Sequence, residues 1–369
     1  MNEKHTPVYI NGIGIVSPQR PLRAEGFLSE AVSYHANQLK CPDPGYKEYI
    51  PAEMIRRMSR IIRMGVTASK MCLRDVMTGK GIEWENGLNP DAIITGTGLG
   101  CVEDTEKFLT SMIKNNEEFL TPTSFIQSTH NTVAGQIALL LKCHSYNFTY
   151  VHRGISFETA LIDAITQIKT GEFGNVLVGG FDEITQHSFA IMNRMGFWKR
   201  KPIDTLQLLN DNQRGSVAGE GAAFMFLENQ KYSGSYACLR GVETFNLPES
   251  SDELWPRLNK FLARHNLTEK EIGFTLLGFS GDPATDYFYH ELIKSFPENS
   301  GFGYFKHLCG EYHTASSFAS GLAALIMKSQ SIPEIVRLNC DEKNGDLENI
   351  LIYNHFRGTS HSFTLLSRP

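Results

Sequence analysis

The stretch Tyr150–Leu161 constrains the fold of this chain more than any other part of the sequence. It follows a predicted strand, turns at Gly154, and opens an apolar-periodic segment from Thr159 to Lys169 that predicts a helix. Several enzyme folds use a strand, a sharp turn and a helix to present a nucleophile at a helix N-terminus. There the positive end of the helix dipole and free backbone N–H groups favour a thiolate or an oxyanion.

Glycine- and proline-punctuated segments surround this turn. Val8–Ser17 predicts a first strand that ends in a glycine-containing turn, and Asp91–Gly100 predicts a buried strand that runs into another. In Leu120–Leu139, Pro122 and Asn131 punctuate the chain, and Asn131 is expected to cap the helix that follows. The remaining predicted strands are 175–183, 215–228, 236–244, 274–279, 350–354 and 362–366, and the remaining helices are 52–77, 252–265, 287–296 and 315–327.

Taken together, these segments resemble the β-ketoacyl-acyl carrier protein synthases, the condensing enzymes of the thiolase superfamily. Gly215–Glu228 matches that family's Gly-Glu-Gly-Ala-Ala hairpin strand almost position for position, and Val8–Ser17 is similar to its opening strand. Leu120–Leu139 is similar to the segment that leads into a helix at the family's subunit interface. The resemblance covers nearly the whole chain, from Val8 to Leu366.

The resemblance implies a thiolase-like α/β fold. Two duplicated βαβαβαββ halves are expected in a layered α-β-α-β-α arrangement. The polar, turn-rich residues 229–235 place the boundary, which gives an N-terminal half at 1–229 and a C-terminal half at 230–369.

Condensation in this family requires a cysteine thiolate and two basic groups, usually histidines. Matching Ala160-Leu161 to the family's pair puts Gly154 at the cysteine position, and glycine cannot hold an acyl group. Anchoring on Asp286 puts Gly278 at the first histidine position, and Glu311 stands at the second. All three positions have changed while the surrounding motifs remain, so no catalytic residue is expected.

Other side chains nearby are the fallback candidates for chemistry. Ser156, His313, His361 and Cys309 could serve an altered acyl-transfer or decarboxylation reaction, with Glu311 as a general base. The alternative is structural: Ser156 hydrogen-bonds the backbone of the first helical turn, and Glu311 forms an ion pair with Lys306 or Arg153. Asp182 and Glu183 are likewise expected to make structural hydrogen bonds.

The family's Gly-Phe-Gly-Gly oxyanion loop corresponds to residues 355–360. Phe356, Gly358 and Thr359 survive, whereas Arg357 replaces a glycine and adds bulk and charge where backbone must approach substrate. In the family fold, the acyl tunnel of one subunit is walled by its neighbour. The tunnel-wall residues expected here follow Pro122 and are Phe125, Ile126 and Gln127.

The resemblance implies a non-catalytic subunit of the chain-length-factor type. Its expected partners are an active β-ketoacyl synthase and an acyl carrier protein, in a fatty-acid- or polyketide-like pathway such as aryl-polyene synthesis. Two alternatives remain: an active acyltransferase of the same fold with altered catalytic residues, and a homodimer that binds acyl or carrier-protein ligands.

Composition and motif spacing exclude other classes. A net charge of −5 argues against a nucleic-acid surface, and no apolar run approaches the roughly 20 residues of a membrane span. The Gly12–Gly14 turn lacks the third glycine of a dinucleotide site, so no cofactor is expected. Seven widely spaced cysteines without a Cys-x-x-Cys pair indicate free thiols, no metal and a cytoplasmic location.

Overall fold

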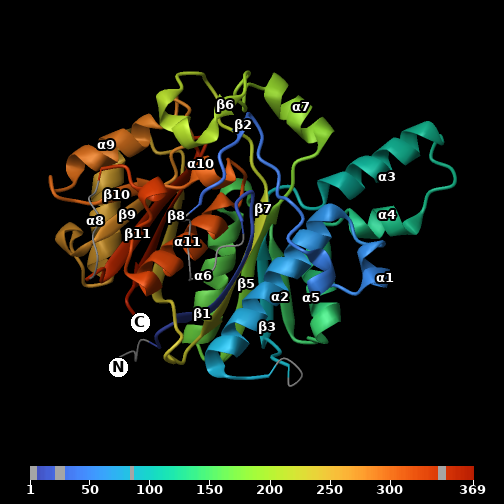
Figure 1. The fold of residues 1–369 in the computed structure, drawn as a ribbon, viewed down its shortest axis with the longest axis horizontal. Helices are drawn as coiled ribbons and strands as arrows, with labels where there is room; N and C mark the ends of the chain where they lie inside the picture. Colours follow the sequence, from blue (N-terminus) through green and yellow to red (C-terminus); the bar gives the residue numbers. More distant parts are fainter. Residues whose placement is uncertain (1–5, 21–29, 84–86, 340–345) are drawn as a thin grey trace.

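The chain folds into two units of the same topology (Figure 1), and the computed structural model describes residues 6–20, 30–83, 87–339 and 346–369. The first unit contains β1 (Tyr9–Val16), α2 (Arg60–Lys80), β3 (Ala92–Gly96), α5 (Thr132–Leu141), β4 (Tyr146–Tyr150), α6 (Ser156–Lys169), β5 (Asn175–Asp182) and β7 (Gly221–Glu228). The second contains β8 (Ala237–Asn246), α8 (Leu254–Arg264), β9 (Phe274–Leu277), α9 (Tyr287–Ser295), β10 (Phe302–Tyr304), α11 (Ala315–Ser329), β11 (Asn349–Phe356) and β12 (Ser360–Ser367). Both units follow the order βαβαβαββ, which confirms the predicted duplication.

The strand order is also the same in both units. It is β1-β7-β5-β3-β4 in the first and β8-β12-β11-β9-β10 in the second. In each unit the first strand pairs antiparallel with the last, and the remaining three strands are parallel to one another. Two residue pairs between β1 and β8 make the hydrogen bonding continuous across ten strands. The predicted boundary at 229 and 230 falls in the connection between β7 and β8, and the two halves as separate domains stay a prediction.

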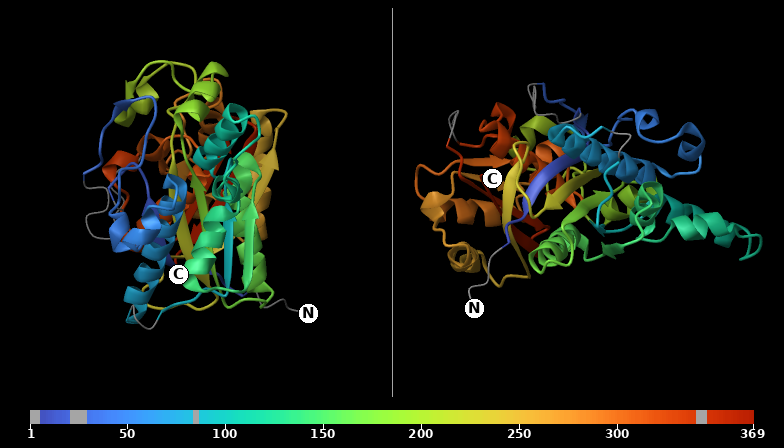
Figure 2. Two further views of the ribbon diagram at one scale, coloured as in Figure 1. Left: turned by 90° about the vertical axis from the view of Figure 1, so that its right-hand side faces the viewer. Right: turned by 90° about the horizontal axis from the view of Figure 1, so that it is seen from below.

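Three hydrophobic clusters fill the spaces between the layers (Figures 1 and 2). The central cluster joins α6 and α11 to both sheets, α2 and α5 cover the outer face of the first sheet, and α8 and α9 cover the second. Strand alternation divides the side chains between clusters: on β7, Met225 faces the central layer while Phe224 and Phe226 face α2. The predicted α-β-α-β-α layering is therefore confirmed.

The remaining elements lie at one end of the layers and at one side. They are β2 (His35–Ala36), α1 (Ala52–Ile55), α3 (Val102–Lys114), α4 (Pro122–Gln127), α7 (Gln186–Arg194), β6 (Ile203–Asp204) and α10 (Lys306–Cys309). Residues 102–127, which comprise α3, α4 and their connection, project from the body and are called the arm (Figures 1 and 2). In the described part of the chain, no helix is long and apolar enough to cross a membrane.

Four local predictions were wrong. The strand predicted over 215–228 begins only at Gly221, as β7. The helix predicted over 52–77 is two helices, because Arg60 is tied to the buried Glu220 carboxylate and α2 begins there. The elbow helix α6 starts at Ser156 rather than Thr159. Asn131 occupies the N-cap position of α5, but its side chain makes no capping hydrogen bond.

Candidate functional site

Gly154 lies in a single 3-10 turn, Arg153–Ile155, directly before α6, and is buried. The Phe356 side chain occupies the space beside it. A Cβ atom added at Gly154 would lie 2.3 Å from Cβ of Phe356 and 2.8 Å from its Cγ. Real Cβ atoms do not approach so closely, so a side chain at residue 154 requires Phe356 to move. The elbow is present, and an aromatic ring stands where its nucleophile would project.

The His313 ring also stacks on Phe356. The His313 and Phe356 ring centroids lie 4.4 Å apart at 25°, and a Cβ added at Gly98 would lie 2.1 Å from Cγ of His313. Burial lowers the pKa of His313, against an opposing contribution from Asp182, and only 8% of the residue is exposed. We call Gly98, Gly154, His313 and Phe356 the aromatic plug. The sequence offered His313 as a fallback acid or base. In the structure, its ring packs against Phe356 and Gly98.

A cavity of about 20 Å³ remains beside the plug. It is bordered by Leu99, Asp182, Glu183, Ile184, Ser188, Phe189, Met192, Trp198, Gly219, Glu311, Tyr312 and His313. A space of this size holds roughly one water molecule. Among the described residues, the space bordered by this set is too small for an acyl chain.

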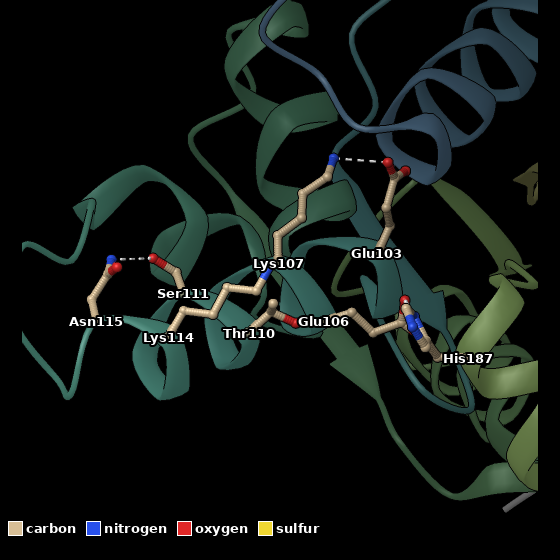
Figure 3. A pocket seen from close by; sticks show the side chains of 8 residues that line it. All are labelled: Glu103, Glu106, Lys107, Thr110, Ser111, Lys114, Asn115 and His187. Carbon is tan, nitrogen blue, oxygen red and sulfur yellow. Dashed lines mark hydrogen bonds and ion pairs between the residues drawn. The ribbon is translucent and has the colours of Figure 1, made fainter.

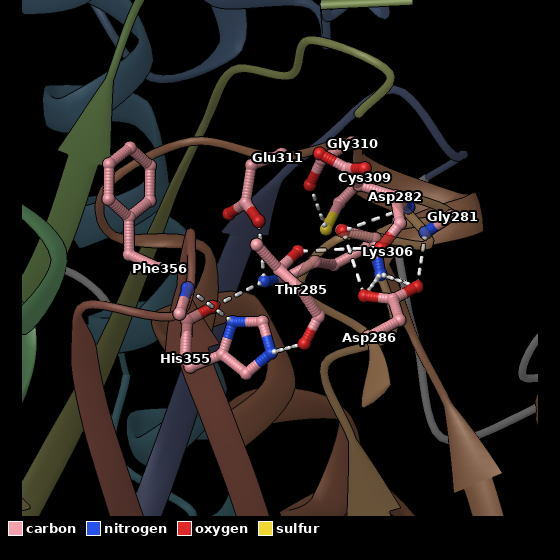
Figure 4. A network of polar contacts seen from close by, with 12 residues as sticks. Gly281, Asp282, Thr285, Asp286, Lys306, Cys309, Gly310, Glu311, His355 and Phe356 are labelled. Atoms are coloured by element: carbon pink, nitrogen blue, oxygen red, sulfur yellow. Dashed lines mark hydrogen bonds and ion pairs between the residues drawn. The ribbon is translucent and has the colours of Figure 1, made fainter. Parts of the chain in front are cut away.

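Glu311 forms the predicted ion pair with Lys306 (Figure 4). Lys306 Nζ donates to Glu311 Oε2 at 2.7 Å and to the His355 carbonyl at 3.0 Å, and the two side chains are 1% and 2% exposed. Burial raises the pKa of Glu311, and the Lys306 ammonium opposes the rise. Glu311 Oε1 has no hydrogen-bond partner among the described residues. The carboxylate at the second histidine position is thus held by an ammonium group.

Gly278 follows β9 and leaves room for two polar groups. A Cβ there would lie 2.3 Å from Asn354 Oδ1 and 2.7 Å from the Tyr289 hydroxyl oxygen. A one-residue slip of the alignment would place Phe279 at the first histidine position instead, and Phe279 is fully buried in the outer cluster of the second unit. Asp286 accepts hydrogen bonds from Ser280 and Gly281, and burial raises its pKa to about 6. Neither register supplies a basic group.

The other fallback residues are held in structural roles. Ser156 Oγ donates to the Arg153 carbonyl at 2.7 Å and accepts from the His152 N–H at 2.8 Å, as the sequence suggested. His361 Nδ1 lies 2.9 Å from the Tyr353 hydroxyl, and burial lowers its pKa to about 4. Burial raises the pKa of the Cys309 thiol, which disfavours a reactive thiolate.

Sequence reasoning missed Glu158. This carboxyl group is fully buried, accepts a hydrogen bond from Ser362 Oγ at 2.8 Å, and burial raises its pKa. A signal was available, because Glu158 falls three and seven residues before Leu161 and Ile165, on the apolar face of α6. A charged residue on such a face marks a buried polar contact.

Asp182 joins the two units, as a structural role predicts. Its Oδ1 accepts from the Gly98 N–H at 2.8 Å, and its Oδ2 accepts from the N–H and hydroxyl of Thr314 at 2.9 and 2.8 Å. The neighbouring Glu183 accepts the N–H of Glu103 at the start of α3. Both carboxylates therefore fix backbone around the site.

The oxyanion-loop residues form the turn between β11 and β12. The Gly358 N–H donates to His355 Nδ1 at 3.2 Å, and Thr359 Oγ1 donates to the Phe356 carbonyl at 2.9 Å. Arg357 has a φ of 55°, and its guanidinium lies 3.5 Å from the centroid of the Phe197 ring. The Gly358 N–H and the Thr359 hydroxyl are thus engaged within the loop, and Arg357 covers the segment after α7.

The three tunnel-wall candidates lie together on α4, at the end of the arm. Phe125 and Ile126 are 57% and 62% exposed, and Gln127 Nε2 donates to the Arg57 carbonyl at 2.8 Å. They do not meet the aromatic plug. They present an apolar surface away from the chain's own site.

A larger groove of about 450 Å³ runs along α3 (Figure 3). The side chains that line it are polar or charged: Glu103, Glu106, Lys107, Thr110, Ser111, Lys114, Asn115 and His187. Lys107 pairs with Glu103 at 2.7 Å, and His187 lies 3.2 Å from Glu106. This lining does not suit an acyl chain.

The described residues hold no group of three or more His, Cys, Asp or Glu placed to bind a metal ion. Six of the seven cysteines lie in the described part of the chain and are free thiols. Cys340 lies outside the described residues.

The pKa of Glu183 gives a testable pH dependence. Burial is the main reason that the pKa of Glu183 is raised to about 8. The Glu103, Glu220 and Asp104 carboxylates also raise this pKa, whereas the hydrogen bond from the Glu103 N–H lowers it. The folded chain therefore holds a proton at pH values where the unfolded chain, with a pKa near 4.5, has lost it. The free energy of unfolding should fall as the pH rises from about 4.5 to about 8.

Glu183→Gln should flatten this part of the profile, because the amide carries no titrating proton. Urea unfolding across that pH range measures the slope. Glu117→Gln, at an exposed position, should keep the wild-type slope. Equal slopes for Glu183→Gln and the wild type would show that Glu183 does not titrate as described.

Comparisons with known proteins agree with this geometry. The family model described as "Beta-ketoacyl synthase, N-terminal domain" matches residues 11–232. The ishigamide ketosynthase/chain length factor superposes with a TM-score of 0.81 at 17% identity, over 98% of this chain and 99% of that chain. A β-ketoacyl synthase from Burkholderia phymatum gives 0.77 at 17% identity, over 98% and 99%.

A third solved structure is the ketosynthase ApeO in complex with its chain length factor ApeC from Xenorhabdus doucetiae. It gives a TM-score of 0.75 at 16% identity, over 98% of each chain. At these identities the likeness concerns the fold. No curated protein sequence matches the chain.

Proposed function

Because the chain belongs to the β-ketoacyl synthase family, we propose that it is a non-catalytic subunit of the chain-length-factor type, which pairs with an active β-ketoacyl synthase. The aromatic plug carries this proposal. Phe356 and His313 fill the space at Gly154 where the acyl-bearing cysteine would project, and only about 20 Å³ remains beside them. A chain that cannot hold the acyl group itself serves the pathway through a partner that can.

An uncovered sheet edge supports the pairing. The two end strands, β4 and β10, hold equivalent places in the two units. The outer edge of β10 is covered, since Gly303 bridges to Arg337 and the Leu338 N–H donates to the Phe302 carbonyl at 2.9 Å. Within the described residues, no strand covers the outer edge of β4. Open edges recruit other chains, and proteins seldom leave them bare.

Apolar side chains surround this open edge. Phe148 on β4 is 46% exposed, Val151 beyond it 40% and Leu139 on α5 67%. The arm adds Leu109, Ile113, Phe119, Phe125 and Ile126. Large, apolar surfaces of this kind are typical of permanent subunit interfaces. A synthase of the same fold, placed against β4, is the partner that we propose.

The proposed pathway is fatty-acid- or polyketide-like, with substrates delivered by an acyl carrier protein and aryl-polyene synthesis as the closest type. The ishigamide and Xenorhabdus complexes each combine a ketosynthase with a chain length factor, which supports this assignment. Co-expression with a cysteine-bearing synthase from the same organism tests it. A stable complex that elongates acyl chains supports the proposal. Thioester turnover by this chain alone, or a homodimer that ignores the synthase, contradicts it.

Shortening the apolar side chains of α4 should lengthen the product. Phe125 and Ile126 are exposed beside the proposed interface, where they would close the end of the partner's tunnel. Phe125→Ala and Ile126→Ala should shift the carrier-bound products to longer chains, as measured by mass spectrometry of the reconstituted complex. Leu247→Ala removes an equally exposed apolar side chain in the second unit and should leave the lengths unchanged. An unaltered distribution in both α4 variants would count against the tunnel-wall role.

A further inference from the structure

Arg153, at the elbow, has an unfavourable backbone conformation that none of the roles described so far explains. Its φ is 51°, in the left-handed region, which costs a residue with a side chain about 1–2 kcal/mol relative to the right-handed one. Glycine would avoid this cost. Strain of this kind persists where the surroundings fix the backbone, and it gathers at functional sites.

The neighbouring contacts hold Arg153 in this conformation. Its carbonyl accepts a hydrogen bond from Ser156 Oγ at 2.7 Å, and the next residue, Gly154, packs directly against Phe356. The backbone cannot relax without moving the aromatic plug. The fold therefore imposes the left-handed backbone conformation at residue 153. It does not require that this residue be an arginine.

In the part of the chain that the structure describes, the Arg153 guanidinium has no partner. Arg153 is exposed, and among the described residues its side chain makes no hydrogen bond and no ion pair. Burial lowers the pKa of His313, and the nearby positive charge of Arg153 adds to this, so the His313 ring is not an acceptor that pairs with the guanidinium. By contrast, Arg60 is bound to Glu220 and Arg257 to Glu253.

Arg153 also lies on the open side of the first unit. It follows β4 by three residues, directly after the exposed Val151 and His152. In a complex formed at the open edge of β4, the guanidinium would point at the other subunit. A desolvated guanidinium at an interface needs an acceptor there, and among protein side chains its planar fork matches a carboxylate in bidentate geometry.

We propose that Arg153 crosses the subunit interface and forms an ion pair with a carboxylate of the partner synthase. This inference rests on the proposed function, because it needs the partner subunit. It adds to that function a residue at the elbow, Arg153, that would recognise the partner synthase. The elbow would thus act as a specificity contact.

Two variants, Arg153→Gly and Arg153→Ala, test the proposed ion pair. The measurements are the dissociation constant of the heterodimer and the unfolding midpoint of the isolated chain. Both variants should weaken the complex about 30-fold or more, because each leaves the partner's carboxylate unpaired. Only Arg153→Gly should raise the unfolding midpoint, since only glycine relieves the left-handed strain. Asn266→Gly, at a φ of 57° after α8, is the control and should not alter binding.

The outcomes separate this inference from the proposed function. If the wild-type chain forms no complex with an active synthase, both are overturned. If the wild type binds and both Arg153 variants bind as tightly, the cross-interface ion pair is overturned and the proposed function stands. Weakened binding that is insensitive to salt would also overturn the ion pair, because a charge contact at an interface is screened by salt.

Discussion

Replacing Gly154 by cysteine is expected to destabilise the chain and to leave it without condensing activity. The new Cβ would lie 2.3 Å from Cβ of Phe356, so the plug must rearrange. Overpacking of this kind typically costs about 1–3 kcal/mol. The new thiol would still lack basic groups if, as the alignment predicts, Gly278 and Glu311 occupy the family's histidine positions. Urea unfolding and a decarboxylation–condensation assay measure the two effects.

Gly135→Cys is the matched control for this experiment. Gly135 lies within α5, and a Cβ there meets no atom within 4 Å. The same substitution should therefore be tolerated, since glycine is itself unfavourable inside a helix. Equal stability of Gly154→Cys and Gly135→Cys would contradict the packing described for the plug. Turnover by Gly154→Cys would contradict the loss of the basic groups.

Replacing Lys306 by methionine should destabilise the chain by about 3–5 kcal/mol, the usual result of breaking a buried ion pair from one side. The Lys306–Glu311 contact is 2.7 Å long and almost completely buried. Lys306 also opposes the raised pKa values of Glu158 and Asp286. Without its charge, these buried carboxyl groups lose their nearby compensating cation. Chemical unfolding of the isolated chain measures the loss.

Two further variants test whether the burial of the Lys306–Glu311 ion pair accounts for the expected loss of stability. Lys294 pairs with Glu291 at the same 2.7 Å but is 67% exposed, so Lys294→Met should change stability by no more than about 1 kcal/mol. Combining Lys306→Met with Glu311→Leu removes both charges and should recover much of the stability. A small effect of Lys306→Met, or no recovery in the double variant, would show that the pair does not carry this energy.

The sequence was sufficient for the architecture because the signals are local. Strand alternation and glycine turns place several strands close to their observed bounds, and β1, β5, β11 and β12 agree within two residues at each end, whereas β7 ends as predicted but starts six residues later. Lys306 and Glu311 are only five residues apart, so their ion pair could also be anticipated. The assignment of Gly154 to the family's cysteine position stays a prediction from the motif.

The filling of the site could not be predicted in the same way. Phe356 meets Gly154 only because β11 and α6 are brought together by the fold, and no local pattern encodes that contact. His313 was considered as an acid or base because its type allows it, whereas its packing against Gly98 depends on two distant loops. The strain at Arg153 is likewise a tertiary effect, imposed by the plug and by Ser156.

The loss of histidines and cysteine alone would describe a damaged enzyme. The structure adds that the space beside Gly154 is packed, and that three side chains around it have partners within the chain: Lys306 pairs with Glu311, Arg357 lies over the Phe197 ring, and His313 stacks on Phe356. Such packing favours a role that depends on the shape of the folded chain. The open edge of β4 and the exposed arm indicate where that shape is used.

Intact-protein mass spectrometry of the complex with an active synthase, after incubation with acyl- and malonyl-carrier protein, tests the central claim most directly. The account predicts an acyl adduct on the partner subunit and none on this chain, with the two chains remaining bound to each other. An acyl adduct on this chain would contradict it, and would place a working nucleophile, Ser156 or Cys309, in a site that the aromatic plug leaves no room to use.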